Sequence, residues 1–184
     1  DLVLHSTPKF VRNTSYEIWF PNAYDSTLID RFPAIPKNHF LGYCGTEGSD
    51  ERKAYLKYIQ NRWDAKLDIF VIGDEMVKMI NSYFVHFNKN IGIDINYRNF
   101  ETIGCGTLLL TNANNGYDEL GFINWKNCVF YNSIPALHTN LQILQNNPSL
   151  VEKISKAGKE LAKEHTYHKR IDFLLTQLEI FYDS

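Results

Sequence analysis

The stretch that decides the fold covers residues 96–112 and reads Asn96-Tyr-Arg-Asn-Phe-Glu-Thr-Ile-Gly-Cys-Gly-Thr-Leu-Leu-Leu-Thr-Asn112. It predicts a short helix that begins after Asn96, whose side chain can accept a hydrogen bond from a free backbone N–H of the first turn. Gly104 and Gly106 bracket the expected helix end, because glycine readily adopts the left-handed conformation that closes a last turn. Residues 107–112 then form an apolar run without alternation, which is typical of a strand covered on both faces.

Two charged residues lie on one face of this predicted helix. Arg98 and Glu101 are three positions apart, so both side chains leave the helix together near its amino end. That end, which includes Asn96 and Tyr97, carries free N–H groups and partial positive charge, and therefore suits a phosphate. A carboxylate there would repel phosphate but could accept hydrogen bonds from both hydroxyls of a ribose. The alternative is an exposed ion pair that contributes only about 0.3–0.5 kcal/mol to stability.

The rest of the chain predicts alternating strands and helices. We expect strands at 39–45, 67–73, 83–87, 107–112 and 128–131, and helices at 50–63, 75–81, 134–145, 150–163 and 167–181. Such alternation predicts an α/β fold with a Rossmann-like parallel sheet and helices on both faces. Near the amino end, residues 1–6 predict a short buried strand and residues 18–20 a second one. Pro33 and Pro36 indicate a linker.

Composition excludes several classes of protein. The chain has 184 residues, of which 44% are hydrophobic, and a net charge of −2, so it can form a globular core and has no electrostatic signature of a nucleic-acid groove. No apolar run approaches the roughly 20 residues that span a bilayer, and no signal peptide is evident. Cys44, Cys105 and Cys128 have neither zinc-motif nor disulfide-framework spacing, which favours a reducing, cytoplasmic location. The chain begins with Asp1, so we interpret it as a fragment or a processed product.

The central stretch also carries a family resemblance. Arg98-x-x-Glu101, followed by Gly104-Cys105-Gly106-Thr107, resembles the R-x-F-E-x-x-x-C-G signature of group 1 glycosyltransferases, and more narrowly of the branch that includes the spore-maturation glycosyltransferases. The resemblance implies a GT-B fold, in which two Rossmann-like domains face each other across a cleft and the C-terminal one holds most of the nucleotide-sugar. Residues 1–36 would then be the end of the N-terminal domain and the linker, and residues 37–184 the nucleotide-sugar-binding domain.

The resemblance also implies a set of site residues. Glu101 would accept the ribose hydroxyls and Arg98 would meet the pyrophosphate. The other candidates lie at strand ends and in the loops that follow them: Gly45, Arg52, Asn88, Asn96, Tyr97, Asn115 and Gly116. Each has a structural alternative, since Asn88 could cap a turn and the Asn115-Gly116 pair is first of all a turn sequence. Gly45-Thr46-Glu47-Gly48 lacks the G-x-G-x-x-G dinucleotide fingerprint.

One departure from the family pattern leaves the catalytic residues unassigned. Many retaining members have two glutamates separated by seven residues, but the position eight before Glu101 is Ile93, and Asp94 is one step away. We therefore expect electrostatic stabilisation of a leaving nucleoside diphosphate and name no nucleophile. No cofactor or metal is expected, and the six histidines show no H-E-x-x-H spacing.

The carboxyl-terminal segment resembles the family as well. Glu164-His165-Thr166-Tyr167-x-x-Arg170 is similar to the H-T-Y-x-x-R that closes family members, and it begins a helix with Ile171, Leu174, Leu175 and Leu178 on an apolar, packing face. In the resembled enzymes the last helix crosses back to the N-terminal domain. We therefore expect this helix to pack on that missing domain and to be partly exposed without it.

The sequence thus predicts the donor-binding half of a glycosyltransferase that transfers a glycosyl group from a nucleoside-diphosphate sugar to an unknown acceptor, such as a glycan or a protein. This fragment alone would be inactive. The alternative is a non-catalytic Rossmann-like module that binds a nucleotide or a partner protein through the tail helix. A response-regulator-like domain is disfavoured, because no acidic cluster follows the first strand of the sheet.

Overall fold

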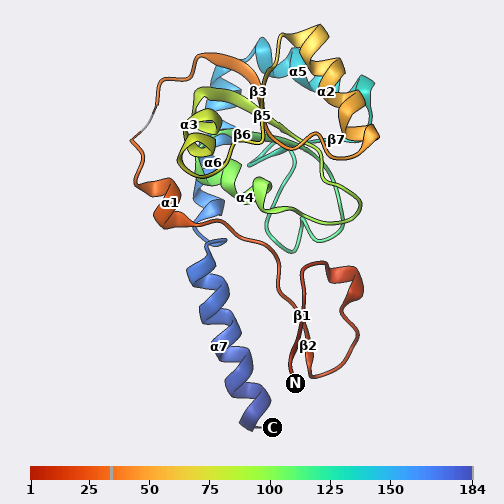
Figure 1. Ribbon diagram of the computed structural model, residues 1–184, viewed down its shortest axis with the longest axis vertical. Coiled ribbons are helices and arrows are strands. Elements are labelled where there is room, and N and C mark those ends of the chain that lie inside the picture. Colours follow the sequence, from red (N-terminus) through yellow and green to blue (C-terminus); the bar gives the residue numbers. More distant parts are fainter. Residues whose placement is uncertain (34, 184) are drawn as a thin grey trace.

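A five-stranded parallel sheet forms the centre of the structure, a computed structural model that describes residues 1–33 and 35–183 (Figure 1). Its strands are, in spatial order, β4 (Lys66–Ile69), β3 (His39–Gly45), β5 (Tyr83–Asn88), β6 (Leu108–Asn112) and β7 (Val129–Tyr131). All four neighbouring pairs are parallel. The predicted Rossmann-like α/β fold is therefore confirmed, and the carboxyl ends of all five strands lie along one edge.

Helices cover both faces of this sheet. One apolar cluster contains side chains of α2 (Asp50–Trp63), α5 (Ile134–Gln145) and α6 (Pro148–Ala162), together with Leu41, Val85 and Leu108 of the strands. The other contains side chains of α3 (Gly73–Ser82) and α4 (Tyr97–Gly104), together with Tyr83 and Leu109. Successive residues of β6 belong to opposite clusters, Leu108 and Leu110 to the first and Leu109 to the second, which explains why this strand is apolar without alternation.

The stretch 96–112 folds as predicted. Asn96 caps α4 by accepting a hydrogen bond from the N–H of Arg98, and Gly106 closes the turn after the helix with a φ of +68°. Gly104 has a packing role, because a Cβ there would lie 2.9 Å from the ring of Tyr24. The helix and the next strand are thereby fixed against each other.

The predicted strand 67–73 is too long. β4 ends at Ile69, Phe70 has a φ of +60°, and α3 begins at Gly73 rather than at residue 75. Phe70 and Ile72 are exposed by 75% and 80%. The apolar residues that suggested a longer strand therefore belong to a loop at the carboxyl edge of the sheet.

The first strand is present but is not buried as predicted. β1 (Val3–His5) pairs in parallel with β2 (Glu17–Trp19) in a separate two-stranded sheet, with the 3₁₀ turn Pro8–Phe10 between them. Val3 and Leu4, whose side chains point to opposite faces of the strand, are both about 40% exposed, so neither face of β1 is fully covered. The predicted linker contains one short helix, α1 (Ser26–Asp30), and its Tyr24 and Ile29 join the core cluster on the α3–α4 face. The proposed domain boundary at residue 36 stays a prediction.

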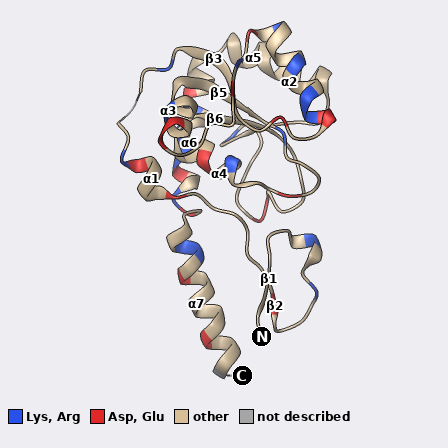
Figure 2. Cartoon of the chain, in the orientation of Figure 1, with Lys and Arg blue, Asp and Glu red and all other residues tan. Residues whose placement is uncertain are grey.

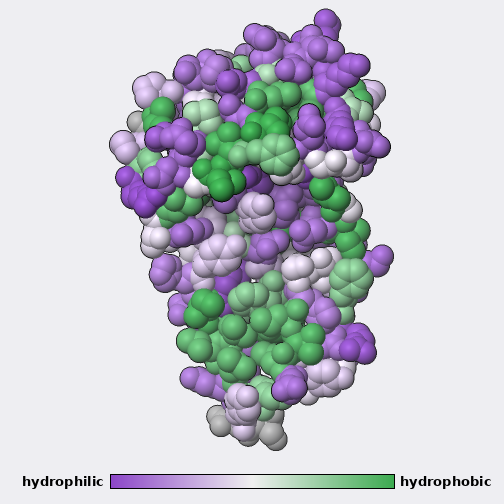
Figure 3. Space-filling view, in the orientation of Figure 1, coloured by the Kyte–Doolittle hydropathy of each residue, from purple (hydrophilic) through white to green (hydrophobic). Residues whose placement is uncertain are grey.

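The last helix, α7 (Tyr167–Asp183), extends away from the sheet (Figure 1). Leu174 and Leu178 are half-buried, whereas Ile171 and Leu175 are 49% and 53% exposed, so the apolar face is partly exposed, as expected. Its packing on an N-terminal domain stays a prediction. Figure 3 shows apolar side chains gathered over α7 and the β1–β2 sheet. Beyond Arg170 this helix carries no Lys or Arg (Figure 2). Across the described residues, no helix is both long and apolar enough to cross a membrane.

Candidate functional site

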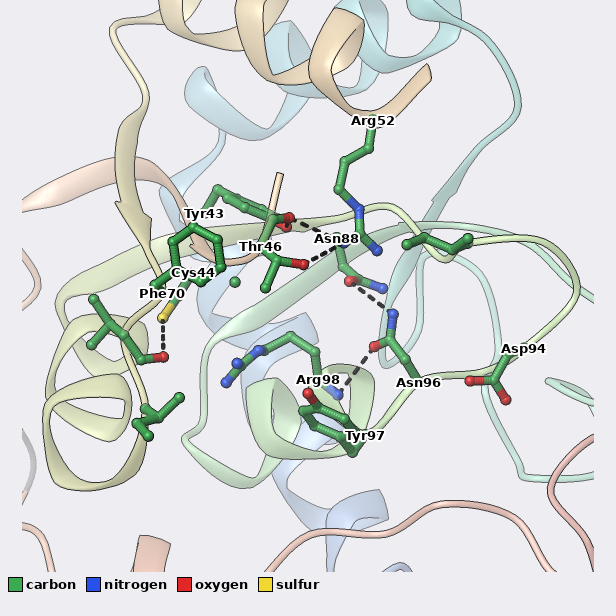
Figure 4. Close-up of a pocket in the computed structure, with 14 residues that line it drawn as sticks. Tyr43, Cys44, Thr46, Arg52, Phe70, Asn88, Asp94, Asn96, Tyr97 and Arg98 are labelled. Atoms are coloured by element: carbon green, nitrogen blue, oxygen red, sulfur yellow. Dashed lines mark hydrogen bonds between the residues drawn. The ribbon is translucent and has the colours of Figure 1, made fainter. Parts of the chain in front are cut away.

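A cavity of about 470 Å³ opens at the carboxyl ends of β3, β4 and β5, beside the start of α4 (Figure 4). This edge is where open parallel α/β sheets bind their ligands. The loops after the three strands and the first residues of α4 supply the lining: Tyr43, Cys44, Gly45, Thr46, Arg52, Phe70, Val71, Ile72, Asn88, Ile91, Asp94, Asn96, Tyr97 and Arg98. Six of the nine predicted site residues are among them.

The amino end of α4 forms one side of this pocket, where Asn96, Tyr97 and Arg98 line the cavity and Glu101 does not. We call these three residues, together with Glu101 behind them, the α4 wall. Asn96 satisfies two first-turn N–H groups itself, since its side chain accepts from Arg98 and its carbonyl from Asn99. Less of the helix end is therefore free for a phosphate than the sequence suggested. Tyr97 is 51% exposed, and its ring lies 5.7 Å from the guanidinium carbon of Arg98. The charge of Arg98 is the main attraction that this wall offers to an anion.

Glu101 pairs with Arg98 and lies beside the pocket lining. Glu101 Oε2 and Arg98 Nη1 are 2.8 Å apart, and the two side chains are only 16% and 11% exposed. Burial raises the pKa of Glu101, and the nearby charge of Arg98 opposes that rise. Glu101 also faces the start of α7, where its charge adds to burial in raising the pKa of Tyr167. The carboxylate is thus held in a low-dielectric position, where hydrogen bonds are stronger than in water.

The opposite side is formed by the β3–α2 connection, which we call the Arg52 wall (Gly45, Thr46, Gly48 and Arg52). The guanidinium of Arg52 donates to the carbonyl of Lys89 from Nε and Nη2, at 3.0 and 2.5 Å, and to the carbonyl of Thr46 from Nη1, at 3.1 Å. Among the residues that the structure describes, no carboxylate lies within ion-pair distance of it. Arg52 is buried, so it carries a charge that is hydrogen-bonded but not neutralised.

Glycines shape the Arg52 wall. Gly48 has a φ of +63°, and a Cβ there would lie 2.9 Å from Arg52 Nη1 and 3.0 Å from Ile91 Cδ1. A Cβ at Gly45 would lie 2.8 Å from the hydroxyl of Tyr43, which in turn donates to the carbonyl of Thr46. The glycines of this loop thus leave room for the side chains of Arg52 and Tyr43.

Asn88 is buried at the back of the pocket, where it belongs to an amide network. Its Nδ2 donates to Asn99 Oδ1 at 3.1 Å and to Thr111 Oγ1 at 3.0 Å, and the hydroxyl of Tyr117 also donates to Asn99 Oδ1, at 2.8 Å. Asn90 donates to Tyr117 in the same cluster. These bonds tie β5 and β6 to the first turn of α4. The network therefore fixes the position from which Arg98 projects.

Asn115 and Gly116 do not line this cavity. Asn115 is exposed, and Gly116, with a φ of +97°, packs so closely on Trp19 that a Cβ would lie 2.9 Å from that ring. Their contact with a ligand stays a prediction. The structure instead gives Gly116 a role in seating the β1–β2 sheet.

Sequence reasoning missed the apolar part of the pocket. Phe70, Val71 and Ile72 follow β4 and Ile91 follows β5, so each stands at the edge where ligands bind. If the predicted strand 67–73 had been ended at Ile69, Phe70, Val71 and Ile72 would have been assigned to the loop at this edge. Asp94 was noted only as displaced from the family pattern. It lines the pocket, and burial raises its pKa.

The described residues contain no cluster of three or more His, Cys, Asp or Glu side chains that could hold a metal ion. The six-residue closing motif is structural: His165 Nε2 donates to the carbonyl of Leu120 at 2.8 Å and its Nδ1 accepts from Arg170, at 2.7 Å. Arg170 also donates to the carbonyl of Pro21, so the motif connects α7 to the segment before α1.

The sequence matches the family described as "Glycosyl transferase-like" over residues 31–176, which is most of the chain. The chain belongs to this family. The match begins in the predicted linker, spans both walls of the pocket and ends within α7. The sequence has no significant match among curated proteins.

Solved structures share the fold of the whole chain. Sucrose-phosphate synthase from Thermosynechococcus elongatus (15% identity, TM-score 0.72) and HepE from Anabaena in complex with UDP-glucose (10% identity, TM-score 0.72) each align with 100% of the chain. The alignments cover 59% and 64% of those structures, so the chain spans about three fifths of their length. The C-terminal domain of a group 1 glycosyl transferase from Francisella tularensis aligns over 97% of its own length and 77% of the chain (12% identity, TM-score 0.55). The fold is that of the C-terminal half of a GT-B glycosyltransferase.

Proposed function

We propose that this chain is the donor-binding half of a glycosyltransferase that transfers a glycosyl group from a nucleoside-diphosphate sugar to an acceptor. One observation carries the proposal: two arginines enter one pocket at the ligand edge of the sheet, and a mostly buried carboxylate lies one helical turn beyond the second. A diphosphate binds to positively charged groups, and the two hydroxyls of a ribose can donate hydrogen bonds to one carboxylate. Arg98 and Glu101 provide such a positive charge and such a carboxylate side by side. Family membership and the fold shared with HepE, solved with UDP-glucose, support the same ligand class.

Each pocket residue then has a proposed role. Arg52, whose charge no described carboxylate neutralises, and Arg98 bind the diphosphate oxygens. Glu101 accepts hydrogen bonds from the ribose hydroxyls, with the carboxylate oriented by Arg98. The apolar rim of Phe70, Val71 and Ile72 excludes water from the bound nucleoside. Asn88 and Asn96 hold the α4 wall in place rather than bind the ligand.

The reaction proposed for the complete protein needs no resident cofactor. Cationic groups in a pocket shielded from water stabilise the charge that develops on a leaving nucleoside diphosphate, which is the main electrostatic contribution expected of this half. The binding site for the acceptor and any general base would be supplied by other parts of the protein. We place the chain in the branch of the spore-maturation glycosyltransferases on the signature at residues 98–106, and in the cytoplasm on its three free cysteines.

The exposed apolar side chains of α7 and of the neighbouring β1–β2 sheet are proposed to pack on the N-terminal domain of the same protein (Figure 3). They include Val3 and Leu4 of β1, Ile171 and Leu175 on one side of α7, and Phe173 and Ile180 on the opposite side. Exposed apolar patches of this kind mark interaction surfaces in soluble proteins.

Hydrolysis of a panel of nucleotide-sugars by the full-length gene product tests the assignment. The proposal predicts slow release of nucleoside diphosphate from one sugar donor, and its loss in Glu101→Ala. A matched surface variant, Glu160→Ala on α6, keeps the rate, because Glu160 pairs only with Lys163 on the helix surface. Binding of a nucleoside diphosphate without any turnover would instead favour the non-catalytic module.

A further inference from the structure

His86 is completely buried in β5 and does not line the pocket, yet it is hydrogen-bonded to Cys44 of β3, which does. β3 and β5 are paired as far as Gly42 and His86, whereas β3 continues beside β4 to Gly45. The backbone N–H of Cys44 therefore has no ladder partner on β5. It donates instead to Nε2 of His86 at 3.0 Å, so that the imidazole takes the place of a strand carbonyl.

The other ring nitrogen reaches α4. Thr102 Oγ1 donates its proton to the carbonyl of Arg98 at 2.7 Å, so it accepts from the Nδ1–H of His86 at 2.6 Å. Both partners require the neutral imidazole with its proton on Nδ1. An unbroken chain of hydrogen bonds thus runs from Cys44 on β3, through His86 and Thr102, to the backbone of Arg98 on α4.

The hydrogen bonds determine the tautomer of His86, and packing against two tyrosines holds its ring in place. The imidazole is stacked between Tyr43 and Tyr83, with centroids 6.3 and 5.9 Å away and interplanar angles of 19° and 17°. The Tyr83 ring in turn covers Gly42, where a Cβ would lie 2.3 Å from it. Since the ring can neither tilt nor shift without losing these contacts, its length sets the spacing between β3 and α4.

We propose that His86 is a positioning residue, whose neutral imidazole spaces the β3 side of the pocket from Arg98 and thereby sets the affinity for a nucleoside diphosphate without touching it. This inference rests on the proposed function, since the ligand is the one assigned above. It adds a residue that neither the sequence motifs nor the pocket lining contains.

Thr102→Val and Thr102→Ser test the proposal in the chain as it stands. Valine keeps the shape of the buried side chain but cannot accept from His86, whereas serine keeps the hydroxyl. Calorimetric titration with UDP and with GDP is expected to show affinity about tenfold lower in Thr102→Val, because Arg98 is displaced from its bound position, and near the wild-type value in Thr102→Ser. Equal affinity in wild type and Thr102→Val would overturn the proposal.

A control separates positioning from general destabilisation. Leu144→Ala opens a cavity under α5, in the cluster on the other face of the sheet. It is expected to lower the unfolding temperature at least as much as Thr102→Val while leaving nucleotide affinity unchanged. If affinity follows unfolding temperature across both variants, the role of His86 is structural only.

The tautomer and the spacing can be measured without any ligand. A ¹⁵N NMR spectrum is expected to show His86 protonated on Nδ1 and unprotonated on Nε2 at pH 7. A crystal structure of Thr102→Val is expected to show a changed distance between the backbones of Cys44 and Arg98. The opposite tautomer, or an unchanged distance, contradicts positioning by His86. Absence of nucleotide binding in wild type, together with the expected tautomer and spacing, would refute the proposed function and the effect on affinity, and would leave only the spacing of β3 and α4 by His86.

Discussion

The two walls of the pocket hold their arginines in opposite ways. On the Arg52 wall, the guanidinium is bonded to two backbone carbonyls and no described carboxylate lies near it. On the α4 wall, Arg98 is paired with Glu101 at 2.8 Å. One wall therefore offers a charge that an anion can neutralise, and the other offers a charge that is already balanced next to a usable acceptor.

This difference suggests a division of the ligand between the walls. Neutral carbonyls orient Arg52 without cancelling its charge, so phosphate oxygens gain most from that side. The Arg98–Glu101 pair is nearly neutral overall and presents both donors and acceptors, which suits a ribose next to a phosphate. Substitutions on one wall are therefore expected to affect a different part of the ligand from substitutions on the other.

Removal of Arg52 should have the largest effect. Arg52→Ala is expected to weaken UDP and GDP binding about 10- to 100-fold, since hydrogen bonds to charged groups contribute about 1.5–3 kcal/mol. Arg52→Lys should recover only part of the loss, because an ammonium keeps the charge but cannot span the carbonyls of Thr46 and Lys89. Isothermal titration measures both, with thermal unfolding as the check on folding. Unchanged affinity in Arg52→Ala would remove the diphosphate from this wall.

Removal of Glu101 should affect the ribose and spare the diphosphate. Wild type is expected to bind UDP about tenfold more tightly than 2′-deoxy-UDP, the cost of one hydrogen bond to a carboxylate. In Glu101→Ala this preference should disappear, while binding of inorganic pyrophosphate should hold or improve because Arg98 loses its partner. A preference for UDP that survives in Glu101→Ala would place the ribose elsewhere.

Two glycines test whether binding depends on the close packing of Gly48 against Arg52. Gly48 and Gly92 have nearly equal φ values, +63° and +62°, so alanine at either position should cost about 1–2 kcal/mol of stability. Only at Gly48 would the new Cβ meet Arg52, since nothing lies within 4 Å of a Cβ at Gly92. We expect severalfold weaker UDP binding in Gly48→Ala alone. Chemical denaturation and titration of both variants check this, and equal affinities would show that Arg52 adapts freely.

Acidification should weaken the α4 wall first, with the smallest effect of the four. Burial raises the pKa of Glu101, so this carboxyl binds its proton at higher pH in the folded chain than in the unfolded one. The stability linked to its protonation is therefore fully present below the pKa of the unfolded chain and lost as pH rises through the raised pKa of the folded chain. The ratio of UDP to 2′-deoxy-UDP affinity should fall as pH is lowered from 7 to 5, and stay flat in Glu101→Ala. A ratio independent of pH in wild type would separate the preference from this carboxyl.

The sequence predicted the α4 wall better than the Arg52 wall, for a physical reason. Asn96, Arg98 and Glu101 act within one helix, so their spacing determines where they lie. Arg52 is bonded to Lys89, 37 positions away, and that contact exists only once β3 and β5 are adjacent. The loop at Phe70–Ile72 was not predicted, because a run of apolar residues has the same sequence pattern in a buried strand and in an exposed rim. The prediction that β1 is buried was wrong because β1 lies in a separate two-stranded sheet, where Val3 and Leu4, on opposite faces, are both exposed.

His86 shows the same limit at the level of a single side chain. An isolated histidine in an apolar strand predicts only a buried residue, and its two hydrogen bonds to Cys44 and Thr102 depend on the register of β3 against β5. Local patterns thus predict the elements of this domain and one wall of its pocket. Contacts between elements determine the rest.

A crystal of this chain soaked with UDP, and in parallel with GDP, tests the central claim most directly. We expect the diphosphate to lie within hydrogen-bonding distance of the guanidinium groups of Arg52 and Arg98. We expect the ribose hydroxyls to donate hydrogen bonds to the carboxylate of Glu101. A nucleotide bound with its diphosphate away from both arginines, or with Glu101 still covered and out of reach of its ribose, would contradict it.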